Sequence, residues 1–315
     1  MKIIVTGNAG FIGSHLTTRL LNAGHTVIGI DNFNSEIYDK CFKMHYTQQL
    51  SQFKNFTQFE CDVLDYPNFG DSTIDAIVHL AGYANIRLSF LEPEKYVRNN
   101  VETTVKILRT INPNTRFIYA SSSSVYGLNN TIPFDETQEL SNIVSPYAQT
   151  KKMCEDVTGM YCRMKQIKAI GLRFFTVYGR PDMAVYKFMQ NISNGSPITV
   201  FGDGSMMRDF TYIDDIVDGI YNCLFVDINK GTHTIYNLGN NKPVSLNQLI
   251  SHIEAITCKK AIINYVDTPI GEVPVTYANI DKAKRELGFN PKVEIEQGLR
   301  LIYESIIAKN ITQNV

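Results

Sequence analysis

The chain has 315 residues, of which 44% are hydrophobic and 19% are charged, and a formal net charge of −1. This length allows a large core and one or two domains, and the balanced charge does not indicate a nucleic-acid partner. Apolar runs such as Ile3–Val5 are too short to cross a bilayer, and the six cysteines form no CxxC pair or metal-ligand spacing. A strand pattern begins at Lys2, so we expect no signal or transit peptide. We therefore expect a cytoplasmic protein without a membrane segment or a metal.

The first element is a short apolar strand, Lys2–Thr6, which leads into three glycines and then a helical pattern. Gly7 permits a tight turn, Gly10 lets the backbone approach a pyrophosphate, and Gly13 lets the helix pack closely on the strand. The helix N-terminus offers amides to the phosphates. The residues expected to contact a dinucleotide here are Gly7, Gly10, Phe11, Ile12 and Gly13.

A second strand, Thr26–Ile30, ends in Asp31, followed by Asn32. A carboxylate at this position can accept hydrogen bonds from an adenosine ribose and would repel a 2′-phosphate. No arginine follows directly, so the sequence favours NAD over NADP. The alternative for Asp31 is an ordinary acid in a turn.

The third and fourth strands, Phe56–Glu60 and Ile74–Leu80, are followed by further residues suited to the cofactor. An acid after the third strand could reach the adenine amino group, and small residues after the fourth would let the cofactor lie against the backbone. A helical pattern at 96–110 comes next. The cofactor-contacting residues expected in this part are Asp62, Val63, Leu80, Ala81, Gly82 and Asn100.

A fifth strand, Arg116–Ala120, ends in four consecutive serines, at the edge of an open sheet where ligands bind. A helix then begins at Pro146, with Ser145 as its cap. It places Tyr147 and Lys151 one turn apart on one face. A phenol has a reference pKa near ~10, and a cation one turn away favours its deprotonated form. The alternative is an amphipathic surface helix that carries both residues by chance.

This helix is expected to bury the side formed by Met153, Val157, Met160, Tyr161 and Met164. A strand at Lys168–Leu172 follows, and after residue 175 the alternation of strands and helices weakens. We expect helices at 213–225, 244–257 and 280–287 and a strand at 234–238. The fold class is thus α/β, with a Rossmann-type doubly wound parallel sheet (1–175 plus about 212–239) and a smaller, discontinuous α/β substrate domain (176–211 plus 240–315).

Together the glycine turn, Asp31, Asp62, the serine turn and the Tyr147–Lys151 pair resemble the extended short-chain dehydrogenase/reductase superfamily over essentially the whole chain. Within it, the segments 172–184, 208–215 and 276–289 look most similar to UDP-glucuronate 4-epimerases. The resemblance implies an NAD-dependent isomerase that inverts C4 of a UDP-sugar through a transient 4-keto intermediate.

In that chemistry Tyr147 acts as the general base, Lys151 and the nicotinamide hold it as phenolate, and Ser122 orients the proton. The resemblance further implies substrate contacts at Arg87, Ser89, Ser122, Ser123, Ser124, Thr176, Arg180 and Arg208. Thr176 and Arg180 match positions expected to grip the glucuronate carboxylate, although Arg180 could instead neutralise Asp182. Arg208 matches a diphosphate contact, or it could pair with Asp209.

One departure affects this assignment. The family usually has about three more residues between Gly179 and Arg180, and shortening the loop shifts Arg180, since each extended residue spans ~3.3 Å or more. An epimerase of neutral UDP-hexoses therefore remains an alternative. Decarboxylases and dehydratases carry carboxylates where this chain has Ser123 and Ser124, which argues against both. A non-catalytic NAD-sensing protein is the remaining alternative, and a homodimer through the 146–165 and 96–110 helices is expected.

Overall fold

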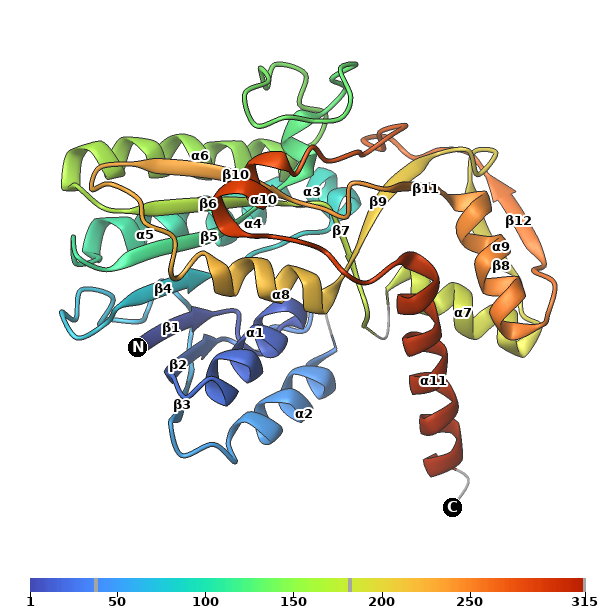
Figure 1. Cartoon of the computed structure of the whole chain (residues 1–315), viewed down its shortest axis with the longest axis horizontal. Coiled ribbons are helices and arrows are strands. Elements are labelled where there is room, and N and C mark those ends of the chain that lie inside the picture. The colour runs from blue at the N-terminus through green and yellow to red at the C-terminus, as the bar shows by residue number, and fades with distance from the viewer. Residues whose placement is uncertain (37–38, 181–182, 314–315) are drawn as a thin grey trace.

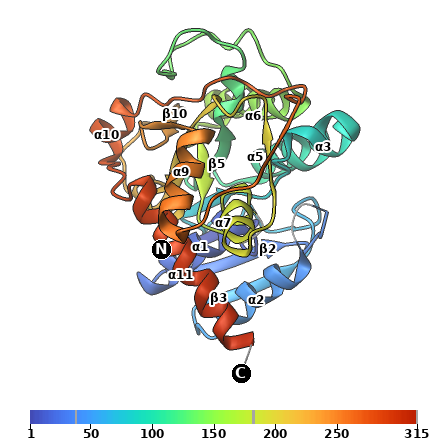
Figure 2. The same ribbon diagram turned by 90° about the vertical axis from the view of Figure 1, so that its right-hand side faces the viewer.

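The computed structural model describes residues 1–36, 39–180 and 183–313, with side chains up to residue 307. A large parallel sheet with helices on both faces occupies one side of the molecule, and a smaller group of helices and short strands lies beside it (Figures 1 and 2). The C-terminal helix packs with this smaller group and extends away from the sheet (Figure 1).

The large sheet has seven parallel strands in the order β10-β6-β5-β4-β1-β2-β3. Their bounds are β1 (Lys2–Thr6), β2 (Thr26–Asp31), β3 (Phe56–Glu60), β4 (Ala76–His79), β5 (Arg116–Ser122), β6 (Ala169–Phe174) and β10 (His233–Leu238). The chain starts in the middle of the sheet, fills one side, and then crosses to the other. This reversal confirms the predicted doubly wound sheet and creates a crevice at the carboxyl ends of β1 and β4.

Helices cover both faces of this sheet because its central strands bury alternate residues on opposite sides. Ile3 and Val5 of β1 belong to one core cluster, whereas Ile4 belongs to another. The first cluster contains α1 (Phe11–Asn22) and α8 (Ile213–Asn222), and α2 (Lys40–Leu50) packs beside α1. The second contains α5 (Thr103–Thr110) and α6 (Pro146–Lys165). Between α4 (Pro93–Tyr96) and α5 lies a π-helical turn, η1 (Val97–Glu102).

The smaller part has its own core, formed by residues that include Val185, Ile198, Leu249 and Leu299. One sheet joins β7 (Thr176–Tyr178), β9 (Met207–Tyr212) and β11 (Pro243–Ser245), and another pairs β8 (Ile198–Phe201) with β12 (Ile263–Val266). The remaining elements are α3 (Ile86–Leu91), the 3₁₀ turn η2 (Ser123–Tyr126), α7 (Ala184–Asn194), α9 (Leu246–Thr257), α10 (Asp281–Leu287) and α11 (Ile295–Gln313). The predicted helix at 244–257 thus begins as strand β11.

The prediction for the buried side of α6 was wrong for its three methionines, whereas Val157 and Tyr161 are partly buried against the second core cluster. Met153, Met160 and Met164 are exposed, and Met164 is 70% exposed. The helix instead buries the side that carries Tyr147 and Lys151. The physical reason is that polar groups on this side find partners inside the protein, whereas hydrophobicity alone had assigned the methionines to the core. An apolar stripe on the outer face of α6 therefore remains uncovered in a single chain.

Among the described residues, no helix is both long and apolar enough to span a membrane.

Candidate active site

The glycine turn after β1 leaves no room for side chains. Gly7 has φ +71°, and a Cβ there would lie 2.7 Å from the amide nitrogen of Ala81. A Cβ on Gly13 would lie 2.0 Å from the carbonyl oxygen of Gly7. Gly10 caps α1 without a side chain, so the first turn of the helix presents its amides to an approaching anion. This bare cradle at a helix N-terminus fits a pyrophosphate.

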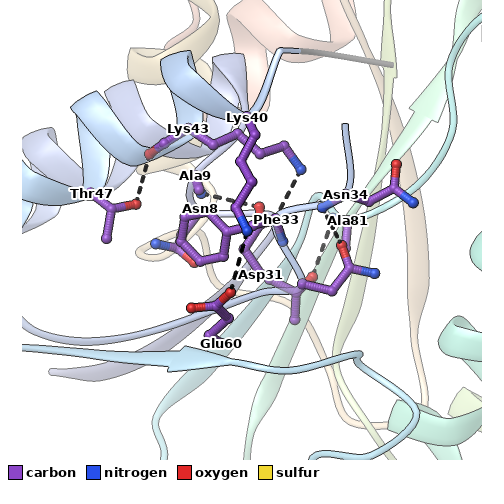
Figure 3. Close-up of polar contacts among 12 residues, drawn as sticks. Asn8, Ala9, Asp31, Phe33, Asn34, Lys40, Lys43, Thr47, Glu60 and Ala81 are labelled. Atoms are coloured by element: carbon purple, nitrogen blue, oxygen red, sulfur yellow. Dashed lines mark hydrogen bonds and ion pairs between the residues drawn. The ribbon is translucent and has the colours of Figure 1, made fainter. Parts of the chain in front are cut away.

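Asp31 lies buried at the end of β2, beside this turn (Figure 3). Its Oδ1 accepts hydrogen bonds from the backbone amide of Phe33 at 2.8 Å and from Nζ of Lys43 at 3.0 Å, and its Oδ2 accepts one from the amide of Ala9 at 3.3 Å. Lys43 comes from α2 and lines the same cavity as Asp31. The sequence analysis missed Lys43, because a lysine twelve residues after an acid carries no recognisable signal.

The predicted adenine-side residues gather at this cavity. Asn32 donates from Nδ2 to Oδ2 of Asp62 at 3.3 Å, and Oδ1 of Asp62 accepts the amide of Leu64 at 2.9 Å. Val63 is buried in the wall. One lobe of the crevice is thus lined by Gly7, Gly10, Asp31, Asn32, Lys43, Asp62, Val63, Leu80, Ala81 and Gly82.

Asn100 holds the strand end that follows β4 in place. Its Oδ1 accepts the amide of Tyr83 at 2.8 Å, and its Nδ2 donates to the Tyr83 carbonyl at 3.1 Å and to Oγ1 of Thr150 at 3.0 Å. A Cβ on Gly82 would lie 2.7 Å from Oδ1 of Asn100. Asn100 therefore shapes the wall of the crevice through the backbone of Gly82 and Tyr83.

His79, the last residue of β4, is hydrogen-bonded through Thr6 to the backbone that follows this strand. Its Nδ1 lies 2.7 Å from Oγ1 of Thr6, which also accepts the amide of Ala81 at 3.2 Å. Burial, with a smaller contribution from the Lys151 charge, lowers the pKa of His79 to about 3. The imidazole is therefore neutral at physiological pH and acts as a hydrogen-bonding partner.

The predicted catalytic residues meet in the second lobe of the crevice. Ser145 caps α6 by accepting the amide of Ala148 at 3.2 Å, so the helix begins where the sequence predicts. One cavity is lined by Gly7, Gly10, Phe11, Ile12, Gly13, Leu80, Gly82, Ser122, Tyr147, Lys151 and Thr176, among others. The glycine turn and the proposed catalytic residues thus share one cavity.

The side chain of Lys151 lines this lobe and is hydrogen-bonded to strand β5. Its Nζ donates to the carbonyl oxygen of Ala120 at 2.9 Å, and burial lowers the pKa of its ammonium. Ser122, two residues along β5, bonds its Oγ to Oγ of Ser124 at 3.1 Å and also accepts the Ser124 amide at 3.2 Å. The ring of Tyr147 packs edge-on against Tyr96, with ring centroids 6.3 Å apart.

Two further cavities adjoin this lobe, and Thr176 lines all three. The first is lined by Ser123, Ser124 and Arg208, together with Glu272. The second has an aromatic wall of Phe188, Phe201 and Phe210 and includes Arg87. Thr176 therefore lies where the second lobe, the hydroxyl-lined cavity and the aromatic pocket meet.

Glu272, which the sequence analysis did not single out, links two arginines and lines both of these further cavities. Arg208 donates from Nη2 to Oε2 of Glu272 at 2.8 Å, and Nη2 of Arg87 lies 3.7 Å from Oε1. Arg208 thus pairs with Glu272 and not with Asp209, whose carboxylate accepts the backbone amides of Asn240, Asn241 and Ala278. The guanidinium of Arg87 also stacks on the Phe201 ring at 4.3 Å.

Two predicted substrate residues lie elsewhere. Ser89 is fully buried, and its hydroxyl donates to the Ile86 carbonyl at 2.6 Å within α3. Arg180 is 2% exposed, and its guanidinium lies 5.3 Å from the centroid of the Phe11 ring, over the start of α1. Asp182, the alternative partner of Arg180, is outside the described residues. The structure thus brings Ser123, Ser124, Thr176 and Arg208 to one cavity, whereas Ser89 and Arg180 do not line it.

The strand order and the chemistry of this crevice define an NAD-binding enzyme of the extended short-chain dehydrogenase/reductase class. Comparison with known proteins is more specific. The model of the GDP-mannose 4,6 dehydratase family matches residues 4–302, and the chain belongs to this family.

Relatives and solved structures include sugar-nucleotide epimerases. The chain is 38% identical to UDP-glucuronate 4-epimerase 1 of Arabidopsis thaliana, over 95% of this chain and 75% of that one. UDP-glucuronic acid 4-epimerase from Bacillus cereus, solved with UDP-glucuronic acid and NAD, matches with a TM-score of 0.90 at 35% identity, covering 98% and 100% of the two chains. MoeE5, solved with UDP-glucose and NAD, matches with a TM-score of 0.84 at 29% identity, with the same coverage.

Proposed function

We propose that this chain is an NAD-dependent UDP-sugar 4-epimerase that interconverts UDP-glucuronate and UDP-galacturonate. The observation that carries the proposal is the single cavity shared by the glycine turn, Ser122, Tyr147 and Lys151. It adjoins two pockets suited to the rest of a nucleotide sugar, with Thr176 at the junction. The related Bacillus cereus enzyme, which binds both UDP-glucuronic acid and NAD, supports the same reading.

The residues of the crevice fit NAD. The turn at Gly7, Gly10 and Gly13 would hold the pyrophosphate, and Asp31 with Lys43 would hold the adenosine ribose. NAD held there would supply the reversible hydride transfer at C4 of the sugar that inversion requires. The protein contributes binding, orientation and the handling of one proton.

That proton is assigned to Tyr147, which acts as general base toward the C4 hydroxyl and as acid when the hydride returns. Lys151 lies one helical turn away and carries the positive charge that favours the phenolate. Its bond to the Ala120 carbonyl keeps the ammonium beside the strand that leads to Ser122. Ser122 can donate to or accept from the C4 oxygen, because a hydroxyl has both capacities.

The substrate side suggests where each part of UDP-glucuronate binds. The aromatic pocket suits uracil, and Arg208, released from Glu272, would bind the diphosphate. The hydroxyls of Ser123, Ser124 and Thr176 would hold the sugar carboxylate. Arg180 is not given this role, because it does not line any of these three cavities.

The same position of Arg180 favours a second candidate, a 4-epimerase of neutral UDP-hexoses. MoeE5, which has been solved with both UDP-glucuronic acid and UDP-glucose, shows that one related site can hold either sugar. The test is to follow C4 inversion by NMR with UDP-glucuronate and with UDP-glucose as separate substrates. Formation of galacturonate supports the main proposal, turnover of UDP-glucose alone supports the second, and release of xylose would refute both.

A matched pair of variants links this assay to the site. Tyr147→Phe is expected to abolish turnover of either sugar while NAD binding is retained. Ser124→Ala should raise the KM for UDP-glucuronate and leave that for UDP-glucose unchanged, because only the former carries a carboxylate. Equal effects on the two sugars would remove the serine turn from carboxylate recognition.

We also infer a cytoplasmic homodimer that pairs the exposed face of α6. Met153, Met160 and Met164 form an apolar stripe there, and Val97 of the neighbouring η1 is also exposed. Packing this face against a second copy would bury it as a helical bundle. Sedimentation equilibrium at micromolar concentration should give twice the chain mass, and Met160→Glu should yield a monomer. A wild-type monomer would contradict the inference.

We also infer the division of the chain into two domains, and we assign 176–211 and 240–315 to the substrate domain.

A further inference from the structure

A buried ion pair lies directly behind the catalytic lobe. Nε and Nη2 of Arg173 in β6 donate to Oε1 and Oε2 of Glu155 in α6 at 2.9 and 2.8 Å. Both residues are largely inaccessible, with Glu155 6% and Arg173 3% exposed. A bidentate pair in such a dry site is rigid, and removing one partner leaves an uncompensated buried charge.

This pair is connected to the strand that carries the serines. Oγ of Ser121 donates to Oε1 of Glu155 at 2.6 Å. One residue earlier, the Ala120 carbonyl accepts Nζ of Lys151 at 2.9 Å. Consecutive residues of β5 are therefore bonded to consecutive turns of α6, since Lys151 and Glu155 are four residues apart. Ser122 follows Ser121 in β5, Tyr147 lies one turn before Lys151 in α6, and both line one cavity.

The ion pair is also tied to the rest of the fold. Arg173 donates from Nη1 to the hydroxyl of Tyr126 at 2.9 Å, and Tyr126 donates to Oδ1 of Asn237 at 2.7 Å. Asn237 in turn donates to the carbonyls of Phe134 and Asn279. Glu155 is thus held from two strands and a loop.

Two groups of the surroundings are charged: the Asp135 carboxylate, whose pKa is lowered by hydrogen bonds from Thr137 and by the charges of Lys282 and Arg173, and Asp156, which acts on His233. The buried phenols, imidazole and thiol beside the pair are neutral at physiological pH. Burial raises the pKa of Tyr119 and of Tyr126, and it lowers the pKa of His233 to about 4. Burial likewise raises the pKa of the thiol of Cys154, next to Glu155 in the chain.

Around Tyr147 the neighbouring phenols are also protonated. Burial raises the pKa of Tyr83 and of Tyr96 to about 12. The Tyr83 hydroxyl donates to the Glu36 carboxylate, which pairs with Lys95. Within the contacts between α6, β5 and β6 described above, the charged side chains are Lys151, Glu155 and Arg173.

We propose that Glu155, fixed by Arg173, is a positioning residue that sets the register of α6 against β5 and keeps Tyr147 and Lys151 aligned with Ser122. The role within catalysis rests on the proposed function. Arg173 has a second effect, because it neutralises the Glu155 carboxylate. Without Arg173, that carboxylate would become the counter-ion of Lys151 one turn away and oppose formation of the phenolate.

This arrangement predicts opposite shifts for the two charge-removing variants. Glu155→Gln leaves the Arg173 charge uncompensated and should lower the pH midpoint at which Tyr147 ionises. Arg173→Met leaves the Glu155 charge and should raise it. Two helical turns separate Tyr147 from Glu155, ~12 Å, so each shift should be about one pH unit at an effective dielectric constant near 20. The double variant should return to the wild-type midpoint.

The measurement is the phenolate absorbance of the NAD-bound protein as a function of pH, with the same titration of Tyr147→Phe subtracted. It requires no substrate, so opposite shifts without turnover of UDP-glucuronate would refute only the proposed function. Unmoved midpoints, or midpoints shifted in the same direction in both variants, would refute an electrostatic role of the pair.

Two milder variants test positioning even if the charge-removing variants do not fold. Ser121→Ala removes the hydrogen bond from Ser121 to Glu155. It should lower kcat about 10-fold and leave KM and the pH midpoint of Tyr147 ionisation unchanged. Arg173→Lys keeps the charge but loses the bidentate geometry, so its midpoint should match wild type while its kcat is reduced. Wild-type kcat in both folded variants would overturn the proposal.

Discussion

The role of Lys151 can be tested by replacing it with methionine. The ammonium and the Tyr147 phenol are four residues apart on one face of α6, ~6 Å along the helix axis. At an effective dielectric constant near 20, two unit charges at this separation interact by roughly 2.8 kcal/mol, which corresponds to about two pH units. Lys151→Met should therefore move the acid limb of the pH–rate profile upward by about two pH units.

The assay is the initial rate of C4 inversion between pH 6 and pH 10, with NAD and UDP-sugar both saturating. At pH 7 the rate should fall about 100-fold, and part of the loss should be recovered at high pH. The control is Lys152→Met, the next residue, whose Nζ pairs with Asp156 at 2.6 Å on the outer side of the helix. Its profile should match wild type.

Folding of the variant has to be checked independently. Lys151 is buried, and an apolar side chain of similar length can replace a buried charge with little loss of stability. The thermal midpoint should therefore remain close to that of wild type. If Lys151→Met folds but loses the same factor of activity at every pH, the ammonium does not favour the phenolate, and its role is confined to holding the cofactor or the Ala120 carbonyl.

Three other changes test separate parts of the structure. Lys43→Met leaves Asp31 buried without its cation and should weaken NAD binding about 10-fold by calorimetry; an unchanged Kd would remove Lys43 from the ribose site. Arg208→Ala should raise the KM for the UDP-sugar about 10-fold without changing NAD affinity, and a loss confined to kcat would contradict a diphosphate contact. The pKa of His79 is about 3 in the folded protein and about 6.5 in the unfolded chain, so protons bind preferentially to the unfolded state below pH 6.5. The free energy of unfolding should therefore fall as the pH drops below 6.5, by ~2 kcal/mol at pH 5. Urea unfolding should show a smaller decrease in His79→Gln, and an equal decrease would assign the acid sensitivity to other groups.

The large sheet and its ligand edge could be predicted because their signals are local. The strand Lys2–Thr6, the glycines after it and the capped start of α6 at Ser145 are each set by neighbours within a few residues. Hydrophobic runs and glycine turns of this kind predict the same local structure whatever the rest of the chain does. The smaller part lacked such signals, and β7, β8, β9 and β12 were not anticipated, because short strands depend on partners distant in the chain.

The grouping of Ser122, Tyr147 and Lys151 was predicted from the Tyr147–Lys151 spacing and the family resemblance, and all three residues line one cavity of the structure. The residues that complete the site were not evident. Lys43 reaches Asp31 from a different element, and Glu272 meets Arg208 across 64 positions of the chain. No periodicity or spacing in the sequence predicts these two side-chain contacts.

The sequence by itself therefore determined the doubly wound sheet, the glycine turn after β1 and the placement of Tyr147 and Lys151 on one face of α6, because each follows from contacts between near neighbours. Only the tertiary structure decided which side of α6 is buried, where the Arg180 guanidinium lies and how Arg173 fixes Glu155. The burial of α6, the position of Arg180 and the Arg173–Glu155 pair depend on buried charges and polar groups finding partners from distant parts of the chain. These partners come together only in the folded structure.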